Sequence, residues 1–567
     1  MKKTLLFALI LFLNGWTVRA ENIISVKLDG GTAGQCLRDA FEKAASYQGS
    51  PVTIQLSPGI YRIPREDATV RKYYVSNTCS EQECPDPQKH IALLLRHLKN
   101  VNVDGRGATI LLDGEMTAFV IDSCQNILFK DLKIDNAHPT QVEMEVVEDG
   151  KDYMKCKVHP TSQYRIVDGQ LEWYGKGWAF RKGIAQMYDP KRDMTWRSWS
   201  PMDNLCEVKE LAPHSLYLRY SKKQEVPVGT VFQIRNGIRD EVCGLINRSR
   251  NVRFEDVHFC YLGNFGVVSQ TSEDIFVNHC RFAPEQGSGR TNAGFADMMQ
   301  FSGCKGTIRI ENSYFAGAHD DPINIHGTHL QVTKVIDRSR LRLRYMHPQT
   351  YGFQSFFPGD SIEIVNPETL LPVYSCLVKS AKMVTPREIE ITLTQPLDRT
   401  FVKLSATWVV ENTTWTPQVY LAHNYFCRIP TRGILVTTRR KTVIEHNTFY
   451  GTQMSGILVA DDGKSWFESG PVHQLTIRRN TFIKCGSPVI LIAPETGTST
   501  SPVHRNISIR ENVFEMASPS SKAISAACVE GLTMEDNFVE YPSSGNTADA
   551  IEYKNCTHVL NKNNRIE

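Results

Sequence analysis

The sequence predicts an all-β protein: a parallel β-helix that carries two inserted small β-barrel domains and a capping helix near its N-terminus. Three observations predict this fold. A short strand-and-turn unit that ends in an aromatic residue recurs along the chain, with a spacing close to 23 residues. Two long stretches with alternating β pattern interrupt the recurrence, and one amphipathic helical stretch precedes it. Strands that recur at such a short period stack into the long parallel sheets of a solenoid.

The first twenty residues have the pattern of a secretory signal peptide. Lys2 and Lys3 precede an apolar run over residues 5–13, and the small residue Ala20 stands directly before Glu21. The run is too short to span a membrane. We therefore expect residues 1–20 to be removed and the mature chain to be exported to the periplasm or beyond. No later stretch approaches about 18 uninterrupted apolar residues, so the sequence predicts no membrane span.

Residues 21–139 are expected to form an N-terminal cap and the first coils. The stretch 33–47 places Leu37 and Phe41 on one face at helical spacing, and a strand follows from Pro51. A helix in this position covers the open end of a stacked-strand core.

The fifteen cysteines do not predict a disulfide framework, because their number is odd and the chain is large enough to be stable without one. Most are expected to be small buried apolar residues. Cys79 and Cys84, which lie in a polar loop, are the best candidates for a disulfide pair. The cysteines are not grouped as Cys-x-x-Cys, so a structural zinc site is not expected.

The recurring unit consists of an alternating strand, a polar turn with Asn or Asp, and an aromatic residue. Residues 237–329 and 418–567 are assigned to the helix body on this basis. The copies end at Phe259, Phe282, Phe315, Phe426, Phe449, Phe482, Phe514 and Phe538, and a weaker copy ends at Ile134. Neighbouring copies are 23 or 24 residues apart, or 32 or 33 where a loop is longer. We expect inward ladders of Phe, Ile, Val and Asn along the stacked strands.

Two inserts interrupt the recurrence, at residues 140–236 and 330–417. Each begins with an alternating β pattern and contains a turn with Pro and Gly before a strand that ends in Asn, at Asn236 in the first and Asn366 in the second. Both inserts are therefore expected to be small β-barrels.

Three carboxylates stand at matched places in the repeat. Asp297 begins one short apolar run, Asp321 begins the next, and Asp320 lies beside it. If these runs are neighbouring rungs, their first residues lie roughly 4.8 Å apart. Carboxylates held this close repel one another and separate their pKa values, so that one is protonated while another is ionised, as acid/base hydrolysis requires. A lone Asp at a strand start is usually a turn cap, but stacked like charges favour catalysis.

Other polar side chains near these acids are candidates for substrate binding. His319 and His326 flank the acidic pair, and either is suited to bind a sugar hydroxyl or to orient an Asp. Gln300 and Asn324 occupy matching places, three residues after the first and the last of the acids. We interpret these two as an inward amide ladder.

The first insert contains four tryptophans among several Arg and Lys residues: Trp173, Trp178, Trp196 and Trp199. Two interpretations are open. The loop overhangs a sugar site, with Trp199 contacting a pyranose face, or the tryptophans belong to the packing of the insert itself. Further candidates to line the cleft are Arg239, Asp240, Glu241 and Glu363, whereas Asp461-Asp462 is interpreted as a turn.

The charge of the chain excludes one class of partner. The formal net charge is only +3, and no basic stretch dominates, so the sequence gives no reason to expect nucleic acid.

The acidic motif resembles that of known glycosidases. The arrangement of Asp297, Asp320-Asp321 and His326-Gly327 is similar to the active-site layout of polygalacturonases, which are inverting enzymes on a right-handed parallel β-helix. The whole mature chain resembles glycoside hydrolase family 110 more closely, through the helical body, both inserts and the stretches ADMMQFSGC and GAHDDPINIHGTH.

The family 110 resemblance implies an exo-acting α-1,3-galactosidase from a gut bacterium. Such an enzyme removes terminal α-1,3-linked galactose, including that of blood group B antigens, with inversion and without a metal or other cofactor. The polygalacturonase pattern implies that Asp320 protonates the leaving oxygen while Asp297 and Asp321 activate water. This sequence lacks the Asn-Thr before the first Asp, and its nearest match to a carboxylate-binding Arg-x-Lys is the distant Arg439-Arg440-Lys441. These departures favour a neutral sugar over galacturonate.

Some alternatives stay open. Inversion requires two carboxyl groups about 6.5–9.5 Å apart, whereas retention requires about 5–5.5 Å. A polygalacturonase-like hydrolase, a lyase and a carbohydrate-binding protein are the alternatives on this fold, although a lyase would need a Lys or Arg base. Two exposed barrels would also be compatible with a homodimer.

Overall fold

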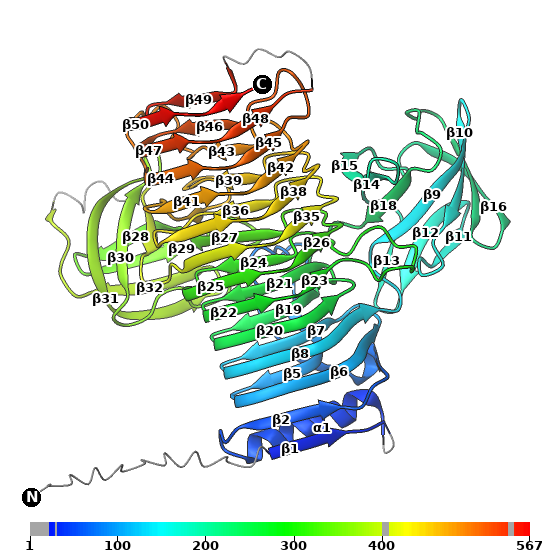
Figure 1. The fold of residues 1–567 in the computed structure, drawn as a ribbon. Helices are drawn as coiled ribbons and strands as arrows, with labels where there is room; N and C mark the ends of the chain where they lie inside the picture. The colour runs from blue at the N-terminus through cyan, green and yellow to red at the C-terminus, as the bar shows by residue number, and fades with distance from the viewer. Residues whose placement is uncertain (1–21, 29–30, 400–406, 543–548) are drawn as a thin grey trace, which may run out of the picture.

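The computed structural model describes residues 22–28, 31–399, 407–542 and 549–567. Over these residues the chain forms a right-handed parallel β-helix from which two inserts project on opposite sides (Figure 1). The expected signal peptide, residues 1–20, lies outside the described residues. In the part of the chain that is described, no helix is long and apolar enough to cross a membrane.

The N-terminal end of the solenoid is covered by a helix. α1 (Ala33–Ser46) begins after Thr32, whose side chain accepts a hydrogen bond from the backbone N–H of Gln35. Leu37 and Phe41 are buried in the main core, where α1 packs on the first strands. The helix therefore closes the open end, as predicted. A short 3-10 helix, η1 (Arg65–Asp67), follows β3.

The longest sheet runs along the whole solenoid and contains 22 strands that pair in parallel. These strands are β1 (Asn22–Val26), β2 (Val52–Leu56), β3 (Ile60–Pro64), β6 (Lys99–Asp113), β8 (Gln125–Asn136), β20 (Arg250–Phe259), β22 (Glu273–Asn278), β23 (Arg281–Phe282), β25 (Lys305–Glu311), β26 (Tyr314–Ala316), β34 (Gln418–Ala422), β35 (Tyr425–Cys427), β37 (Thr442–Glu445), β38 (Thr448–Tyr450), β41 (Leu475–Arg478), β42 (Thr481–Ile483), β44 (His504–Arg510), β45 (Val513–Glu515), β47 (Val529–Glu535), β48 (Phe538–Glu540), β50 (Thr557–Lys562) and β51 (Arg565–Ile566).

A second sheet of 13 strands forms another face of the solenoid. Its path is β4 (Thr69–Lys72), β5 (Gln88–Arg96), β7 (Thr117–Asp122), β19 (Val242–Asn247), β21 (Phe265–Gln270), β24 (Met299–Ser302), β27 (Ile323–Thr328), β36 (Ile434–Val436), β39 (Ile457–Val459), β43 (Ile490–Ile492), β46 (Ile524–Ala527) and β49 (Ile551–Lys554), with β40 (Glu468–Ser469) paired to β27. All of these pair in parallel except β4 and β40.

A ladder of stacked phenylalanines fills the core. The rings of successive coils lie 4.6–5.0 Å apart between centroids, from Phe259 through Phe282, Phe315, Phe426, Phe449 and Phe482 to Phe514. The last predicted rung is wrong by one residue. Val539 pairs with Phe514 and is buried, whereas Phe538 pairs with Val513 and is partly exposed. Because side chains alternate along a strand, this shift moves the aromatic ring out of the core.

An asparagine ladder runs beside the Phe ladder at one turn of each C-terminal coil. Each amide nitrogen donates to the amide oxygen of the next member, through Asn424, Asn447, Asn480, Asn512, Asn537 and Asn564. The same nitrogens also donate to backbone carbonyls of the preceding coil. The predicted inward Asn ladder is therefore present.

The first insert is formed by antiparallel sheets that share one core. Seven strands follow the order β15-β14-β18-β9-β10-β17-β16, and a three-stranded sheet packs against them. The bounds are β9 (Val142–Asp149), β10 (Tyr153–Val158), β11 (Tyr164–Val167), β12 (Gln170–Gly175), β13 (Trp178–Phe180), β14 (Ile184–Asp189), β15 (Met194–Ser198), β16 (Leu205–Ala212), β17 (Ser215–Tyr220) and β18 (Val231–Arg235). The first strand pairs with the last, since Val142 lies opposite Ile234.

The second insert is a closed barrel with the strand order β28-β29-β32-β31-β30-β33. The bounds are β28 (Leu330–Asp337), β29 (Arg340–Arg344), β30 (Ser361–Asn366), β31 (Leu371–Thr385), β32 (Glu388–Leu393) and β33 (Val409–Asn412). Its first and last strands are also neighbours, since Leu330 lies opposite Val410. Each insert thus returns the chain close to the point where it left the solenoid.

Cys79 and Cys84 are neighbouring free thiols and not the expected disulfide. Both are buried, and the Cys79 thiol donates to Oδ1 of Asp240 over 3.6 Å. The two sulfurs lie within 4.8 Å of each other, so the pairing prediction found the right neighbours but the wrong bond.

Candidate active site

The three predicted acids meet on the 13-stranded sheet. β24 pairs with β27 so that Met299 lies opposite Ile323, and two residues earlier this register brings Asp297 against Asp321. One oxygen from each of Asp297, Asp320 and Asp321 lies within 4.8 Å of the other two. The stacking expected from the repeat is therefore what the structure contains.

The residues that stack at this position of successive coils form one register column. Phe265 occupies it on the coil before Asp297, and Arg432 occupies it on the coil after Asp321. Gly266 stands one position later, where a Cβ would lie only 2.1 Å from the carbonyl oxygen of Met298 on the next coil. Only glycine fits such a close backbone approach.

Arg432 is the partner of Asp321 and was missed by sequence reasoning. Its Nε and Nη2 donate to the two carboxylate oxygens over 2.9 and 2.8 Å, and its backbone N–H donates over 3.2 Å. Burial raises the pKa of Asp321, and the Arg432 charge opposes that rise. Arg432 directly precedes Gly433 and stacks on Asp321 in the next coil. The spacing of the repeat could therefore have identified Arg432 from the sequence.

Asp320 faces three guanidinium groups. Arg239 Nη2 donates to its Oδ2 over 3.0 Å, while Arg197 and Arg432 approach its Oδ1 at 3.7 and 3.8 Å. Arg239 also lies over the ring of Phe265, 5.4 Å from its centroid. The predicted binding residue Arg239 is thus in the pocket, bonded to one of the acids.

Asp297 has the least compensated charge of the three. Its carboxylate accepts a hydrogen bond from Nδ2 of Asn324 over 3.4 Å, and no arginine of the described ranges forms an ion pair with it. Burial and the charges of Asp320 and Asp321 raise its pKa well above the ordinary range. Of the three acids, Asp297 is therefore the one whose surroundings most disfavour the ionised form.

The two predicted histidines lie behind the pocket, where they fix its walls. His319 is fully buried, its Nε2 3 Å or less from amides of the first insert and its Nδ1 accepting from Arg235 over 3.3 Å. Burial and Arg235 lower its pKa well below the ordinary value, so the ring is neutral. His326 Nδ1 donates to the Gly327 carbonyl over 2.7 Å, which leaves Nε2 to accept from Gln300 over 2.9 Å.

The inward amide ladder predicted for Gln300 and Asn324 is wrong. Met299, Phe301, Ile323 and Ile325 occupy the inward positions of the same two strands and belong to the core. Since side chains alternate, the two amides point outward. Asn324 consequently lines the pocket.

Trp199 packs in the first insert and does not line the pocket. Its ring meets those of Tyr220 and Phe232 edge-on, at 5.8 and 5.6 Å. Trp173 and Trp178 are buried in the same core. Packing, the plainer of the two interpretations, therefore accounts for these tryptophans, and the part of this cluster that reaches the acids is Arg197.

Three other residues considered for the cleft make ion pairs or contacts elsewhere. Asp240 pairs with Lys89, Glu363 pairs with Arg439, and Glu241 is buried against His90. These carboxylates stabilise the scaffold around the pocket.

The remaining pocket wall comes from segments far apart in the sequence. The cavity has a volume of about 110 Å³, and it is also lined by Asn77, Asp462, Trp466, Glu468 and Glu495. Asn77 donates to Glu468 over 2.8 Å. No pattern in the sequence links these positions, because they come together only through the packing of loops.

The predicted turn at Asp461-Asp462 presents an aromatic ring at the pocket. The Asp462 carboxylate accepts hydrogen bonds from the backbone N–H groups of residues 464–467, which closes the turn. Trp466 stacks on His347 with ring centroids 4.2 Å apart, and it is 42% exposed. An exposed aromatic face beside carboxylates is the arrangement with which proteins bind a sugar ring.

The arrangement is suited to acid/base hydrolysis. It combines Asp297, a carboxyl group whose pKa is raised by burial and by its acidic neighbours, with two carboxylates that bond arginines. Three carboxylates are also the ligands of hard cations, but Arg239 and Arg432 already bond these oxygens and oppose a further positive charge.

The chain is similar to known proteins over nearly all of its length. Residues 142–232 match the domain family described as GLAA-B beta-barrel domain I, and residues 340–403 match GLAA-B beta-barrel domain II. A Bacteroides thetaiotaomicron protein named alpha-1,3-galactosidase A is 55% identical over 549 residues, which cover 96% of each chain. A Bacteroides fragilis protein of the same name is 37% identical over 471 residues, which cover 81% of this chain and 77% of that one.

Among solved structures, the Yersinia enterocolitica family 28 exopolygalacturonase has a TM-score of 0.44 at 9% identity, covering 96% of this chain and 79% of that one. The sequence identities, which extend through both inserts and the helical body, show that this chain belongs to the alpha-1,3-galactosidase A family.

Proposed function

We propose that this protein is an exo-acting glycoside hydrolase that removes terminal α-1,3-linked galactose from glycans, both branched blood group B structures and linear ones. The observation that carries the proposal is the cluster of Asp297, Asp320 and Asp321 in one pocket. The 55% identity to a protein named alpha-1,3-galactosidase A supports the choice of sugar.

The size of the pocket supports action at a chain end. Its volume of about 110 Å³ is well below the roughly 300–1,000 Å³ of pockets that accept larger ligands. Such a pocket suits a single sugar ring, with Trp466 available to one face of the ring. The rest of the glycan then lies outside.

The chemistry requires one proton and one water molecule. The acid donates its proton to the glycosidic oxygen, the C–O bond to the anomeric carbon breaks, and water attacks that carbon as a carboxylate removes its proton. By resemblance, Asp320 is the acid, and Asp297 and Asp321 activate the water. For this assignment Asp320 has to be protonated when substrate binds. Asp297, whose pKa is raised, has an oxygen within 4.8 Å of Asp320 and can supply that proton.

We further propose that the reaction inverts the anomeric configuration. The nearest-oxygen spacing within the triad is below the range of about 6.5–9.5 Å that a two-carboxylate inverting site requires. Inversion therefore rests on the family resemblance and on a water held between two of three carboxylates, and the identity of the first product decides it.

The test is an assay with group B trisaccharide, its linear counterpart without fucose, and polygalacturonate. We expect galactose from the first two and no product from the third. The Asp320→Asn and Asp321→Asn variants should lose the activity while still binding the glycan, and NMR should detect β-galactose first.

Three results would overturn parts of this proposal. Release of galacturonate or of an unsaturated product would contradict the reaction. If the wild-type protein binds the glycan but does not hydrolyse it, the protein is a carbohydrate-binding protein and not an enzyme. First-formed α-galactose would exclude inversion.

Two further properties are proposed. The N-terminal pattern supports export to the periplasm or outside the cell, and the two projecting inserts support a homodimer, which sedimentation of the purified protein would detect.

A further inference from the structure

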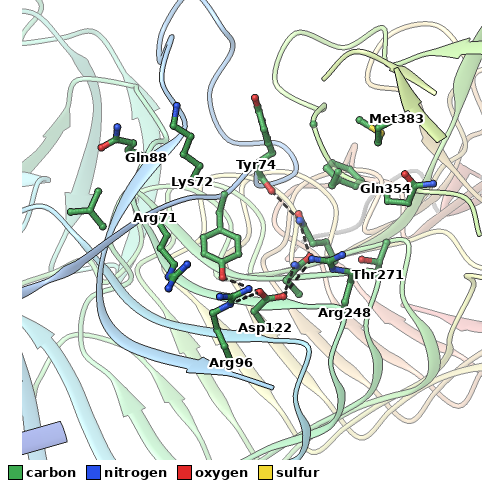
Figure 2. Close-up of a pocket in the computed structure, with 16 residues that line it drawn as sticks. Arg71, Lys72, Tyr74, Gln88, Arg96, Asp122, Arg248, Thr271, Gln354 and Met383 are labelled. Carbon is green, nitrogen blue, oxygen red and sulfur yellow. Dashed lines mark hydrogen bonds and ion pairs between the residues drawn. The ribbon is translucent and has the colours of Figure 1, made fainter. Parts of the chain in front are cut away.

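A second and larger cavity lies on the same sheet as the acids. Its volume is about 790 Å³, and it opens between the β4–β5 end of the sheet and the second insert (Figure 2). This volume lies within the range of about 300–1,000 Å³ that is typical of small-ligand sites. We call it the basic groove, because Arg71, Lys72, Arg96 and Arg248 line it.

The floor of the basic groove continues to the active site along one register column. The paired residues of successive strands are Arg96, Asp122, Asn247, Gln270, Ser302 and His326. Gln270, on the groove floor, and His326, behind the acids, are two coil steps apart, roughly 10 Å at the spacing of neighbouring strands. The two cavities are therefore neighbours on one face.

A single segment separates them. The Gln270 amide accepts from the backbone N–H of Ser76 and donates to the carbonyl of Tyr74, both over 3.0 Å. Tyr74 lines the basic groove, whereas Asn77, three residues later, lines the acidic pocket. Residues 74–77 thus form a wall shared by both cavities.

The groove carries an excess of positive charge. Asp122 is the one carboxylate among its lining residues. This carboxylate accepts from Tyr73 and Asn247, both over 3.0 Å, and forms ion pairs with Arg96 at 3.1 Å and Arg248 at 3.8 Å. Its charge is already compensated by Arg96 and Arg248, so it does not neutralise Arg71, which can bind an anion.

Three polar groups of the groove have no hydrogen-bond or ion-pair partner among the described residues: the Arg71 guanidinium and the hydroxyls of Tyr74 and Thr271. Arg71 is exposed, and Figure 2 shows its guanidinium on the same side of the cavity as that of Arg96. Lys72 lies at the outer rim, paired with Asp86 at 3.0 Å on the surface.

Aromatic side chains form the opposite side. Tyr74 meets Tyr351 edge-on at 5.4 Å, and Phe353 of the second insert lines the groove beside it. Gly352 has a φ of +85°, and a Cβ there would overlap the Tyr74 ring at 2.1 Å. The insert is therefore fitted closely against Tyr74, and the two together give the groove its shape.

We propose that the basic groove is a second binding site, for a saccharide that carries a sulfate or carboxylate group. Guanidinium groups bind such oxyanions in a bidentate manner. Tyr74 offers a partly exposed ring for contact with a sugar, and the Tyr74 and Thr271 hydroxyls offer partners for sugar hydroxyls. A nucleic acid would need a broad basic face, whereas here the cations lie inside a bounded cavity of a chain with net charge +3.

The test measures binding of sulfated lactose, sialylated lactose and unmodified lactose by calorimetry. None of these contains α-galactose, so the outcome does not depend on the proposed hydrolase activity. We expect one or both acidic probes to bind at least about tenfold tighter than lactose, and more weakly as salt screens the charges. Comparison of the two acidic probes tells which anionic group the groove accepts.

Variants locate the binding. Arg71→Ala/Lys72→Ala should weaken binding of the acidic probe about tenfold or more, since both positive charges are lost. Met383→Trp should block the groove from the insert side. The matched control Lys151→Ala/Arg181→Ala removes the same charge from exposed positions of the first insert. Hydrolysis of a small neutral α-galactoside should be unchanged in all of these variants.

Equal binding of acidic and neutral lactose would overturn the proposal. So would the absence of binding, or an equal loss in the groove variant and in the control. If Met383→Trp leaves the affinity unchanged while Arg71→Ala/Lys72→Ala lowers it, the site lies outside the groove.

Discussion

At the scale of single residues, the three carboxylates of the active site differ in how far neighbouring positive charges compensate them. Asp321 and Asp320 each bond an arginine, at 2.8 and 3.0 Å, whereas Asp297 is buried and accepts a hydrogen bond from the amide of Asn324. The structure therefore maintains one carboxyl group whose ionised form is unfavourable. Such a group destabilises the fold in proportion to its charge.

Asp297→Asn should stabilise the protein at high pH while abolishing activity. Burial and its neighbours raise the Asp297 pKa in the folded state, so its contribution to stability is complete below the unfolded pKa and is lost as pH rises through the folded pKa. Asn does not titrate. The gain in melting temperature over wild type should thus grow between pH 4 and pH 8, on the order of 1 °C per kcal/mol in a chain this long.

Thermal scans at several pH values check this expectation. Asp152→Asn, at an exposed hairpin position, is the control and should give no pH-dependent difference. A constant difference across the pH range would show that Asp297 is not protonated abnormally.

Asp320→Asn should distinguish substrates by their leaving groups. If Asp320 is the acid, the variant should lose about 10²–10⁴-fold on an α-1,3-galactosyl disaccharide. It should lose far less on a dinitrophenyl α-galactoside, whose leaving group needs no proton. Steady-state kinetics with both substrates measures this ratio.

The reverse pattern, with Asp297→Asn sparing the dinitrophenyl substrate, would assign the acid to Asp297. Equal losses on both substrates would contradict the role of Asp320 as acid.

The sequence predicted the positions of single residues correctly where the repeat stacks them at the same position of neighbouring coils. The stacking of Asp297 on Asp321 follows from that register, and Arg432 was available by the same reasoning. The function of Trp199 could not be predicted, because the sequence does not tell whether an aromatic ring faces its own domain or a neighbouring one.

At the scale of elements, the ladders determine which coils form and in which register. Asn480 shows why the inward amides are required. Its Nδ2 donates to the Ile444 carbonyl over 2.9 Å and to Asn512 over 3.0 Å, while its Oδ1 accepts from the backbone and side chain of Asn447.

Asn480→Ala should destabilise the C-terminal coils strongly. It leaves several fully buried groups without partners, at about 1–3 kcal/mol for each. Thermal melting and protease resistance of the C-terminal half measure the effect. Asn278→Ala, which removes an exposed amide contact on the outer face, should change either readout little. Comparable losses in both variants would contradict a special role for the ladder.

Arg387 of the second insert should act as a positioning residue for the pocket wall. It donates to the carbonyls of His347 and Pro348 over 2.8 and 2.6 Å and pairs with Glu81 at 3.0 Å. His347 in turn stacks on Trp466. The insert thereby supports a ring at the mouth of the acidic pocket.

Arg387→Ala should therefore raise KM for the glycan about tenfold, equivalent to about 1.4 kcal/mol of binding, with little change in kcat. Initial-rate kinetics separates the two constants. Arg344→Ala, at an exposed position of the same barrel, is the control. A fall in kcat with unchanged KM would place the effect on the chemistry and not on binding.

Element-scale prediction was most reliable for periodic segments and least reliable at their ends. The 23-residue period gave the coils, but the last rung, at Val539, was assigned to Phe538, because both residues are apolar and a shift of one reverses the face. The outward direction of Asn324 was missed for a similar reason: an amide fits either an inward ladder or a pocket wall.

At the scale of the whole molecule, two cavities on one sheet face are bordered by inserts that project from opposite sides (Figure 1). The sequence predicted the solenoid, the cap and the two inserts, since each has its own periodicity. It did not predict the rest of the pocket wall, because Asn77, Trp466 and Glu495 come together only when three separate loops have packed.

The proposed export predicts a processed N-terminus. Protein recovered from the extracytoplasmic fraction of the producing cell should begin near Glu21 when it is analysed by mass spectrometry. Leu9→Arg, which places a charge in the apolar run, should leave the unprocessed chain in the cytoplasm. Export of that variant at the normal level would contradict the signal-peptide assignment.

The adjacency of first and last strands in each insert has a consequence for how the chain folds. Asp321 and Arg432 are 111 residues apart, and joining them through a flexible loop would cost roughly 1.4 kcal/mol more entropy than joining residues one coil apart. A barrel that folds first removes most of this difference, since Leu330 and Val410 are then already neighbours. The two active-site coils on either side of the insert can thus pair nearly as easily as coils that follow each other directly in the sequence.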